Sequence, residues 1–228
     1  MTNPLKRGLA VALLALPTLA ATPAHSTSAA PEPHRLSLAK AIDKLPRATE
    51  AREGYVRTSF KHWVDADHDK CATRAEVLIS ESRTKPVIEG KCKVTGGTWY
   101  SYYDGKTVTE PKGLDIDHMV PLAEAWDSGA SKWTPKHREA YANDLDAERS
   151  LVAVTAKSNR SKADQDPAQW LPPLADARCT YAADWTATKL RWKLTANKGE
   201  VAALEKLAEG CGRQQVEYVP APTDTAAV

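Results

Sequence analysis

The chain has 228 residues, with 31 Lys and Arg, 29 Asp and Glu, and four cysteines. This length fits one domain, or one domain with a helical extension. The formal net charge of +2 argues against a protein that holds nucleic acid mainly by a broad positive field.

Residues 1–24 have the pattern of a secretory signal peptide. Lys6-Arg7 precedes an apolar run at 8–16, and small residues follow. We expect cleavage after Ala24 or, as an alternative, after Ala30. The apolar run is shorter than the ~20 residues that span a membrane, so we predict a secreted protein with no membrane segment after cleavage. Cleavage removes two basic and no acidic residues, which leaves a net charge of about zero.

The next segments predict a leader and two helices without catalytic chemistry. Residues 25–35 are mostly small residues and Pro, which predicts a flexible leader. From Leu36 to Leu45, apolar residues recur at helical spacing, and a second helix is predicted from Thr49 to about Trp63.

An acidic segment follows and has two interpretations. Four carboxylates stand at the first, third, fifth and twelfth places of one segment: Asp65, Asp67, Asp69 and Glu76. This is the oxygen spacing of an EF-hand Ca²⁺ loop, although Lys70 replaces the usual Gly at a cost on the order of 1 kcal/mol. The alternative is an acidic turn before a helix that begins near Thr73, with Thr73 and Glu76 forming a capping box.

Four cysteines in an exported chain predict two disulfides, for which three pairings are possible. We favour Cys71–Cys92 and Cys179–Cys211, because each pair brackets a compact segment and leaves the hairpin described below free of cross-links. Each loop should stabilise the fold by roughly 3 kcal/mol. Zinc is not expected, since the cysteines lack close paired spacing.

Residues 91–108 alternate in polarity and are rich in Tyr, Trp, Thr and Val, which predicts strands with turns at Gly96-Gly97 and Asp104-Gly105. The aromatic residues here are Trp99, Tyr100, Tyr102 and Tyr103. They could stack on exposed bases, but such side chains on a half-buried sheet more often pack in the core.

The segment Asp115-Ile-Asp-His-Met-Val-Pro121 is the most informative part of the chain. Asp117 offers a hard oxygen to a divalent cation, and His118 offers an imidazole that can take a proton near neutral pH. The apolar run Leu151–Val154 then predicts a strand, and Asn159 follows it. On a β-hairpin and its following helix, these residue types suffice for one-metal phosphodiester hydrolysis.

This order resembles the HNH endonucleases of the ββα-metal superfamily, and most closely the secreted HNH proteins related to the C-terminal domain of GmrSD-type restriction endonucleases. The resemblance implies an α+β fold with a ββα-metal (HNH) hairpin-plus-helix core at about 114–168, surrounded by packing helices. It also implies that His118 is the general base and that Asp117 and Asn159 hold one Mg²⁺ or Mn²⁺.

The chain departs from the family pattern between the two predicted strands. Ser150 stands where the family has its middle Asn. A Ser can make only some of the hydrogen bonds of that Asn, whether within the hairpin loop or to substrate. Residues 123–149 are interpreted as an inserted helical excursion. Because adjacent strand residues point to opposite faces, the first strand must end or bulge at Asp117-His118. Asp115, two residues earlier, could share the metal face, either as an alternate ligand or as a residue that supports the ligands without touching the metal.

Basic residues near these positions are candidates for substrate phosphates. Arg160 and Lys162 flank Asn159, although a solvated helix face is the ordinary alternative. Similar secreted relatives share the segment around Arg74, which implies either a phosphate contact in the cleft or a structural ion pair. The remaining chain predicts a helix that starts at Asp166-Pro167 and a final helix at 198–208.

We therefore predict one nuclease domain at 36–213, followed by a disordered tail at 214–228. The predicted activity is metal-dependent hydrolysis of nucleic acid, with DNA favoured, by a secreted monomer. One alternative is a secreted calcium-binding or surface-interaction module with a non-catalytic HNH-like fold. Another is a different metal-dependent phosphoesterase that uses the same residues.

Overall fold

A computed structural model describes residues 32–223, so the predicted signal peptide lies outside the described residues. The helices are α1 (Leu38–Asp43), α2 (Thr73–Ser80), α3 (Leu122–Asp127), α4 (Pro135–Ala142), α5 (Ala156–Lys162), α6 (Arg178–Trp192) and α7 (Lys198–Gly210). Short 3-10 turns are η1 (Arg57–Ser59), η2 (Pro111–Gly113), η3 (Ala130–Lys132) and η4 (Ala175–Ala177). Among the described residues, no helix combines the length and apolarity that a membrane crossing requires.

The strands pair two by two into small antiparallel sheets, which confirms the α+β class. The pairs are β1 (His34–Ser37) with β8 (Gln215–Tyr218), β2 (Val87–Glu89) with β3 (Lys93–Gly96), β4 (Trp99–Ser101) with β5 (Lys106–Val108), and β6 (Leu114–His118) with β7 (Leu151–Thr155). The expected strands between 91 and 108 are therefore present.

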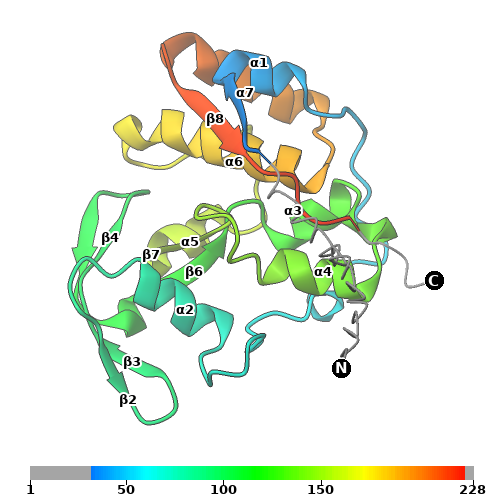
Figure 1. Ribbon diagram of the computed structural model, residues 1–228. Helices are drawn as coiled ribbons and strands as arrows, with labels where there is room; N and C mark the ends of the chain where they lie inside the picture. The colour runs from blue at the N-terminus through cyan, green and yellow to red at the C-terminus, as the bar shows by residue number, and fades with distance from the viewer. Residues whose placement is uncertain (1–31, 224–228) are drawn as a thin grey trace, which may run out of the picture. The chain divides into compact units, whose positions relative to one another are not determined.

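The β6–β7 pair carries the sequence motif. Its register is regular, from Leu114 opposite Thr155 to His118 opposite Leu151. The long connection between the strands contains α3, η3 and α4, as predicted for the inserted segment. Helix α5 begins directly after β7, because the Thr155 side chain accepts a hydrogen bond from the Ser158 backbone N–H. Figure 1 shows α5 beside both strands.

Two groups of buried side chains hold this arrangement. The smaller one lies on one face of the β6–β7 pair, and its members are Val77, Leu78, Trp99, Leu114, Ile116, Leu151 and Ala153. The larger one gathers around α1, α3, α6 and α7. All five residues of β7 are buried, which explains why this strand is a continuous apolar run in the sequence.

A buried ammonium ties the inserted segment to the C-terminal helices. The Nζ atom of Lys189 on α6 lies 2.8 Å from Glu124 Oε1 on α3 and 2.7 Å from Glu200 Oε2 on α7. It also donates to Ser128 Oγ and the Thr195 carbonyl. Because all these polar groups are paired, a charged lysine is tolerated in the interior.

Both predicted disulfides are present, Cys71–Cys92 and Cys179–Cys211. The first links the acidic segment to the β2–β3 hairpin, and the second joins the ends of α6 and α7. The final helix also forms as expected, with Asn197 and Glu200 making a capping box at its start.

The predicted helix at 49–63 is wrong. This segment is irregular apart from the short turn η1, and Gly54 and Trp63 both have left-handed backbone angles that interrupt a helix (φ +75° and +61°). The predicted helix at Asp166 is also wrong. Asp166 Oδ1 accepts the Ala168 N–H as a cap would, but the chain makes only a turn there.

The boundaries of the ordered domain also need correction. His34 and Arg35, expected in the leader, belong to β1, and residues 215–218, expected in a disordered tail, form β8. Val216 of β8 is buried. The two strands lie about 180 residues apart in sequence and share no turn, so neither has a local hairpin signal.

We predict that Glu81 makes stability depend on pH. Its Oε2 accepts the backbone N–H of Ala153 on β7, and burial raises its pKa from 4.5 to about 7. The folded protein therefore keeps a proton that the unfolded chain releases earlier. Stability should be full below pH 4.5, fall as the pH rises toward 7, and then level off.

Denaturant unfolding across this pH range tests the prediction with Glu81→Gln, whose amide oxygen can still accept the Ala153 N–H. This variant should show a smaller fall in stability than the wild type, because Glu124 and Asp184, whose pKa values burial also raises to about 7, still contribute. Glu209→Gln on an exposed position of α7 should keep the full fall. Identical pH profiles for Glu81→Gln and the wild type would contradict the assignment.

Candidate active site at the end of strand β6

The three residues predicted to carry the chemistry line one cavity of about 240 Å³: Asp117, His118 and Asn159. Its other lining residues are Arg57, Ile116, Pro121, Leu122, Arg160, Ala163 and Asp164. The β6–β7 register has no bulge, and β6 ends at His118. Of the two expected alternatives, the structure therefore has the strand end, after which the chain turns away at Pro121.

His118 is buried, and its protonation state is set by its surroundings. Its Nε2 lies 2.9 Å from the carbonyl oxygen of Ala142 at the end of α4. A carbonyl only accepts hydrogen bonds, so Nε2 carries the hydrogen and Nδ1 of the neutral ring has the free lone pair. Burial, with a smaller contribution from the nearby positive charge of Arg57, lowers the pKa of His118 to about 3.

Aromatic rings hold the His118 imidazole in place. The Trp63 and Tyr141 ring centroids lie 5.5 Å and 6.4 Å from it, with the Tyr141 ring stacked. His62 approaches edge-on at 6.4 Å. These contacts and the bond to Ala142 leave the ring little freedom to rotate.

Asp117 is buried with a lysine and a tyrosine. Its Oδ2 accepts hydrogen bonds from Lys162 Nζ and Tyr103 Oη, each at 2.7 Å. Among the described residues, its Oδ1 makes no hydrogen bond. Burial raises the pKa of the Asp117 carboxyl and the Lys162 ammonium opposes that rise, so the carboxylate depends on Lys162 to stay ionised.

Lys162 does not occupy the place expected for a phosphate contact. Its side chain is fully buried, and Nζ also donates to the His118 carbonyl at 2.9 Å and lies 5.9 Å from the centre of the Trp185 ring. Lys162 therefore holds Asp117 and His118 from the protein interior. The expectation of a phosphate ligand is wrong for this residue because its ammonium has no access to a substrate.

The predicted neighbours on α5 lie on the accessible side. Asn159 Nδ2 donates to Asp115 Oδ2 at 3.2 Å, and the amide oxygen of Asn159 takes no part in that bond. Arg160 is largely exposed, and its Nε lies 3.4 Å from the same Asp115 oxygen. Asp115 therefore lies beside Asn159, and its Oδ2 atom contacts both Asn159 and Arg160.

Two further residues expected to contact substrate are engaged elsewhere. Arg74 donates to the backbone carbonyls of Pro111 and Leu114 and makes no ion pair among the described residues, and it lies outside the cavity of Asp117, so its phosphate contact stays a prediction. Ser150 is buried and donates to Asp144 Oδ2, while its carbonyl accepts the Met119 N–H. Ser150 therefore shapes the hairpin loop through its side chain and its backbone, and its contact with substrate stays a prediction.

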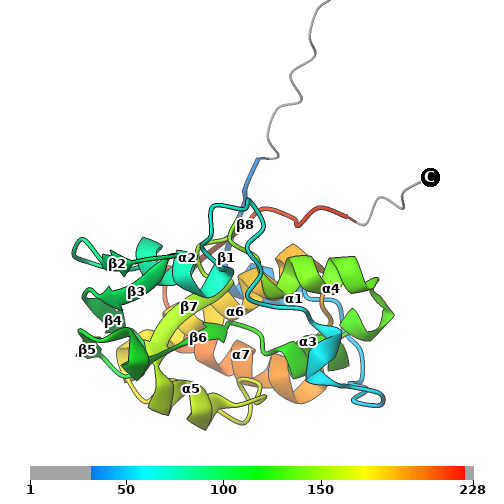
Figure 2. The ribbon, with the colours of Figure 1, turned by 90° about the horizontal axis from the view of Figure 1, so that it is seen from below.

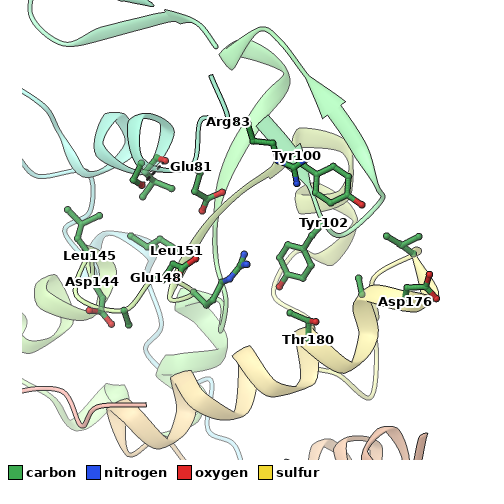
Figure 3. A pocket seen from close by; sticks show the side chains of 16 residues that line it. Glu81, Arg83, Tyr100, Tyr102, Asp144, Leu145, Glu148, Leu151, Asp176 and Thr180 are labelled. Atoms are coloured by element: carbon green, nitrogen blue, oxygen red, sulfur yellow. Dashed lines mark hydrogen bonds between the residues drawn. The ribbon is translucent and has the colours of Figure 1, made fainter. Parts of the chain in front are cut away.

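The aromatic residues of the β4 region divide between core and surface. Trp99 and Tyr103 are buried, which agrees with the core alternative. Tyr100 and Tyr102 line a separate cavity of about 750 Å³, shown in Figure 3. Arg83 lies over the Tyr100 ring, and Arg149 lies over the Tyr102 ring.

The acidic segment combines features of both interpretations. Carboxylate oxygens of Asp65, Asp67 and Asp69 lie within 4.8 Å of one another, and Lys70 adopts the left-handed conformation that its position in a calcium loop requires (φ +83°). Helix α2 does begin at Thr73, but the capping box is wrong, because the Thr73 hydroxyl donates to the Val64 carbonyl instead. The Ca²⁺ site, with Glu76 as its last ligand, stays a prediction.

Several site residues were not predicted from the sequence. Arg57 lies in the segment expected to be a packing helix, and Tyr103 was one of four aromatic residues with no distinguishing signal. The Ala142 carbonyl belongs to the backbone, so no residue type marks it. Asn143, the next residue, is the C-cap of α4.

Comparison with known proteins identifies the family. The model of the C-terminal domain of GmrSD restriction endonucleases matches residues 60–206, which include β6, β7 and α5. The chain belongs to this family. It is also 38% identical over 202 residues to an uncharacterized secreted protein of Arthroderma benhamiae, covering 89% of this chain and 95% of that protein. No solved structure matches the chain.

Membership of the GmrSD C-terminal domain family indicates a nuclease-like function and a nucleic acid substrate. Proteins with such domains generally use a divalent metal. The secreted relative and the two disulfides agree with the predicted location, and the chain is a secreted protein.

We predict that Lys162 is needed to keep Asp117 compatible with the folded interior. Lys162→Met leaves a buried carboxylate without its counter-ion, so it should lower the free energy of unfolding by about 3–5 kcal/mol. Chemical denaturation at neutral pH measures this change.

The double variant Asp117→Asn, Lys162→Met is the control, because it removes both charges and should recover part of the loss. If the single Lys162→Met variant were as stable as the wild type, the buried ion pair would not have the structural role assigned to it.

Proposed function

We propose that this protein is a secreted endonuclease that hydrolyses phosphodiester bonds, preferentially in DNA, with a ββα-metal core formed by β6, β7 and α5. The observation that carries the proposal is the single cavity lined by Asp117, His118 and Asn159. These residues come from the end of β6 and from α5, and Asn159 lies 41 positions after His118. Family membership supports the same class of activity.

His118 is the proposed general base. Its hydrogen-bonded Nε2 fixes the ring so that Nδ1 is the basic atom. At physiological pH the ring is neutral, so its Nδ1 lone pair is free to receive the proton of the attacking water, although the burial that lowers its pKa to about 3 also weakens it as a base. The carbonyl of Ala142 keeps the imidazole oriented while that proton arrives, and it stabilises the positive ring that results.

The donor set fits a hard divalent cation such as Mg²⁺ or Mn²⁺. Asp117 Oδ1 and the Asn159 amide oxygen are hard ligands, and the cavity leaves space for water and a phosphate oxygen. We assign these two residues as ligands, with Asp115 as an alternate. A cation bound there supplies charge stabilisation at the phosphate and at the leaving 3′ oxygen.

In this proposal the residues around the metal ligands either orient Asp117 or bind the phosphate. Lys162 and Tyr103 occupy Oδ2 of Asp117, which directs Oδ1 of the carboxylate to the cavity. Arg160 and Arg57 line the cavity as cations that can contact the phosphate. Together they orient the scissile phosphate toward the water that His118 deprotonates.

A calcium-binding or interaction module with a non-catalytic HNH-like fold is the alternative function. The segment 65–76 gives it support, because the Oδ1 atom of Asp65 is buried without a hydrogen-bond partner in the described residues. The two functions differ in whether the chain cleaves nucleic acid at all.

We expect the oxidised mature protein to cleave plasmid DNA in the presence of Mg²⁺ or Mn²⁺ and to lose this activity in EDTA. His118→Ala should lower the cleavage rate by at least about 100-fold, the lower end of the contribution of a general base. Gel electrophoresis over time measures both effects.

His34→Ala is the matched control, since His34 lies on β1 away from the cavity. Circular dichroism and a thermal melt verify that the His118→Ala protein is folded. If the protein cleaved neither DNA nor RNA with any divalent metal, the nuclease proposal would be rejected. Wild-type activity in a folded His118→Ala protein would reject His118 as the base.

A further inference from the structure

A second cavity near the site has a strongly basic lining. It has a volume of about 720 Å³ and lies between α2, the β2–β3 hairpin and η2. Its charged lining residues, here called the basic groove, are Lys70, Arg74, Lys91, Lys93, Lys112 and Glu110. Figures 1 and 2 both show α2 and the β2–β3 hairpin side by side.

The charge of the basic groove is distinctive because the chain as a whole is almost neutral. Its lining includes five basic side chains and one carboxylate. Lys112 pairs with that carboxylate, on Glu110, but Lys91 and Lys93 are exposed and make no ion pair among the described residues. A local positive surface therefore remains available for an anionic partner.

Arg74 gives the groove a fixed wall. Its guanidinium donates to the carbonyls of Pro111 and Leu114, and neither contact neutralises its charge. Leu114 is the first residue of β6, the strand that ends at His118. The groove is thus attached directly to the strand that carries the candidate catalytic residues.

Trp63 connects the groove to the candidate active site. Its side chain lines the groove, and its ring centroid lies 5.5 Å from that of His118. A ligand in the groove would therefore lie one aromatic ring away from the general base. A chain molecule with several phosphates is long enough to extend from the groove past Trp63 toward the cavity of His118.

We propose that the basic groove binds the phosphodiester backbone of the nucleic acid substrate on one side of the scissile bond. This inference rests on the proposed nuclease function. The exposed lysines match a row of phosphates, and Arg74, which two backbone carbonyls hold, adds a cation at a fixed position. The groove lies beside Trp63, which contacts His118. This location favours the nucleic acid substrate as the ligand over an unrelated acidic protein, whose binding would not require a position next to the general base.

The test compares two double variants of the mature protein. Lys91→Gln, Lys93→Gln removes two charges from the groove, and Lys198→Gln, Lys206→Gln removes two from exposed positions on α7, which is not part of it. Fluorescence anisotropy in EDTA measures binding of a labelled DNA duplex at several salt concentrations without cleavage. Cleavage with Mg²⁺ is then followed for each protein.

The groove variant should bind more weakly and should lower the slope of log affinity against log salt by about two, roughly one for each lost phosphate contact. It should raise KM with kcat unchanged, because the lysines do not touch the reacting atoms. The α7 variant should match the wild type in all three measurements.

Equal affinity and equal salt slope in the groove variant and the α7 variant would overturn the groove proposal while the wild type still cleaves. Binding of polyglutamate as tight as that of DNA would also overturn it, since the groove would then be a general polyanion surface. A wild-type protein that fails to cleave at all would instead reject the proposed nuclease function.

Discussion

The contact between Lys162 and Asp117 is the interaction on which the candidate site depends. It joins α5 to β6 through a 2.7 Å ion pair that is buried on both sides, and the same ammonium binds the His118 carbonyl. An unpaired charge at this depth would be strongly destabilising, so each partner requires the other. Because Asn159 lies one helical turn before Lys162, fixing Lys162 also fixes where Asn159 faces the cavity.

The long segment between β6 and β7 also supports the candidate site. It returns the Ala142 carbonyl to His118 and places Tyr141 against the imidazole. The segment is itself held in place by Lys189 and by the paired Asp144 and Arg191. Asp144 also accepts the Ser150 hydroxyl, so the residue that departs from the family pattern is part of this buried network. Insertion and hairpin therefore support one another.

Much of this fold was predictable because its signals are local. An apolar run predicted β7, small helical patterns predicted the inserted segment, and loop compactness favoured the two disulfides that form. The pairing of β1 with β8 was not predictable, since its partners are distant in sequence and have no shared turn. The helix predicted at 49–63 failed because two left-handed residues interrupt it.

The site was predictable in residue type but not in its supporting contacts. Asp117, His118 and Asn159 carry a recognisable order of side chains, and the structure brings them to one cavity. Lys162 looked like a surface residue because its helix is rich in basic and polar residues. Only the fold shows that a carboxylate 45 positions earlier draws it inside. Backbone partners such as the Ala142 carbonyl have no signature in residue type.

The most direct test of the central claim is Mn²⁺ binding measured by electron paramagnetic resonance on the metal-free mature protein. The proposal predicts a bound Mn²⁺ that disappears in Asn159→Ala and persists when Asp65 and Glu76 are both replaced by Ala. A bound ion that survives Asn159→Ala but disappears in the Asp65→Ala, Glu76→Ala protein would contradict the assignment of the metal to Asp117 and Asn159.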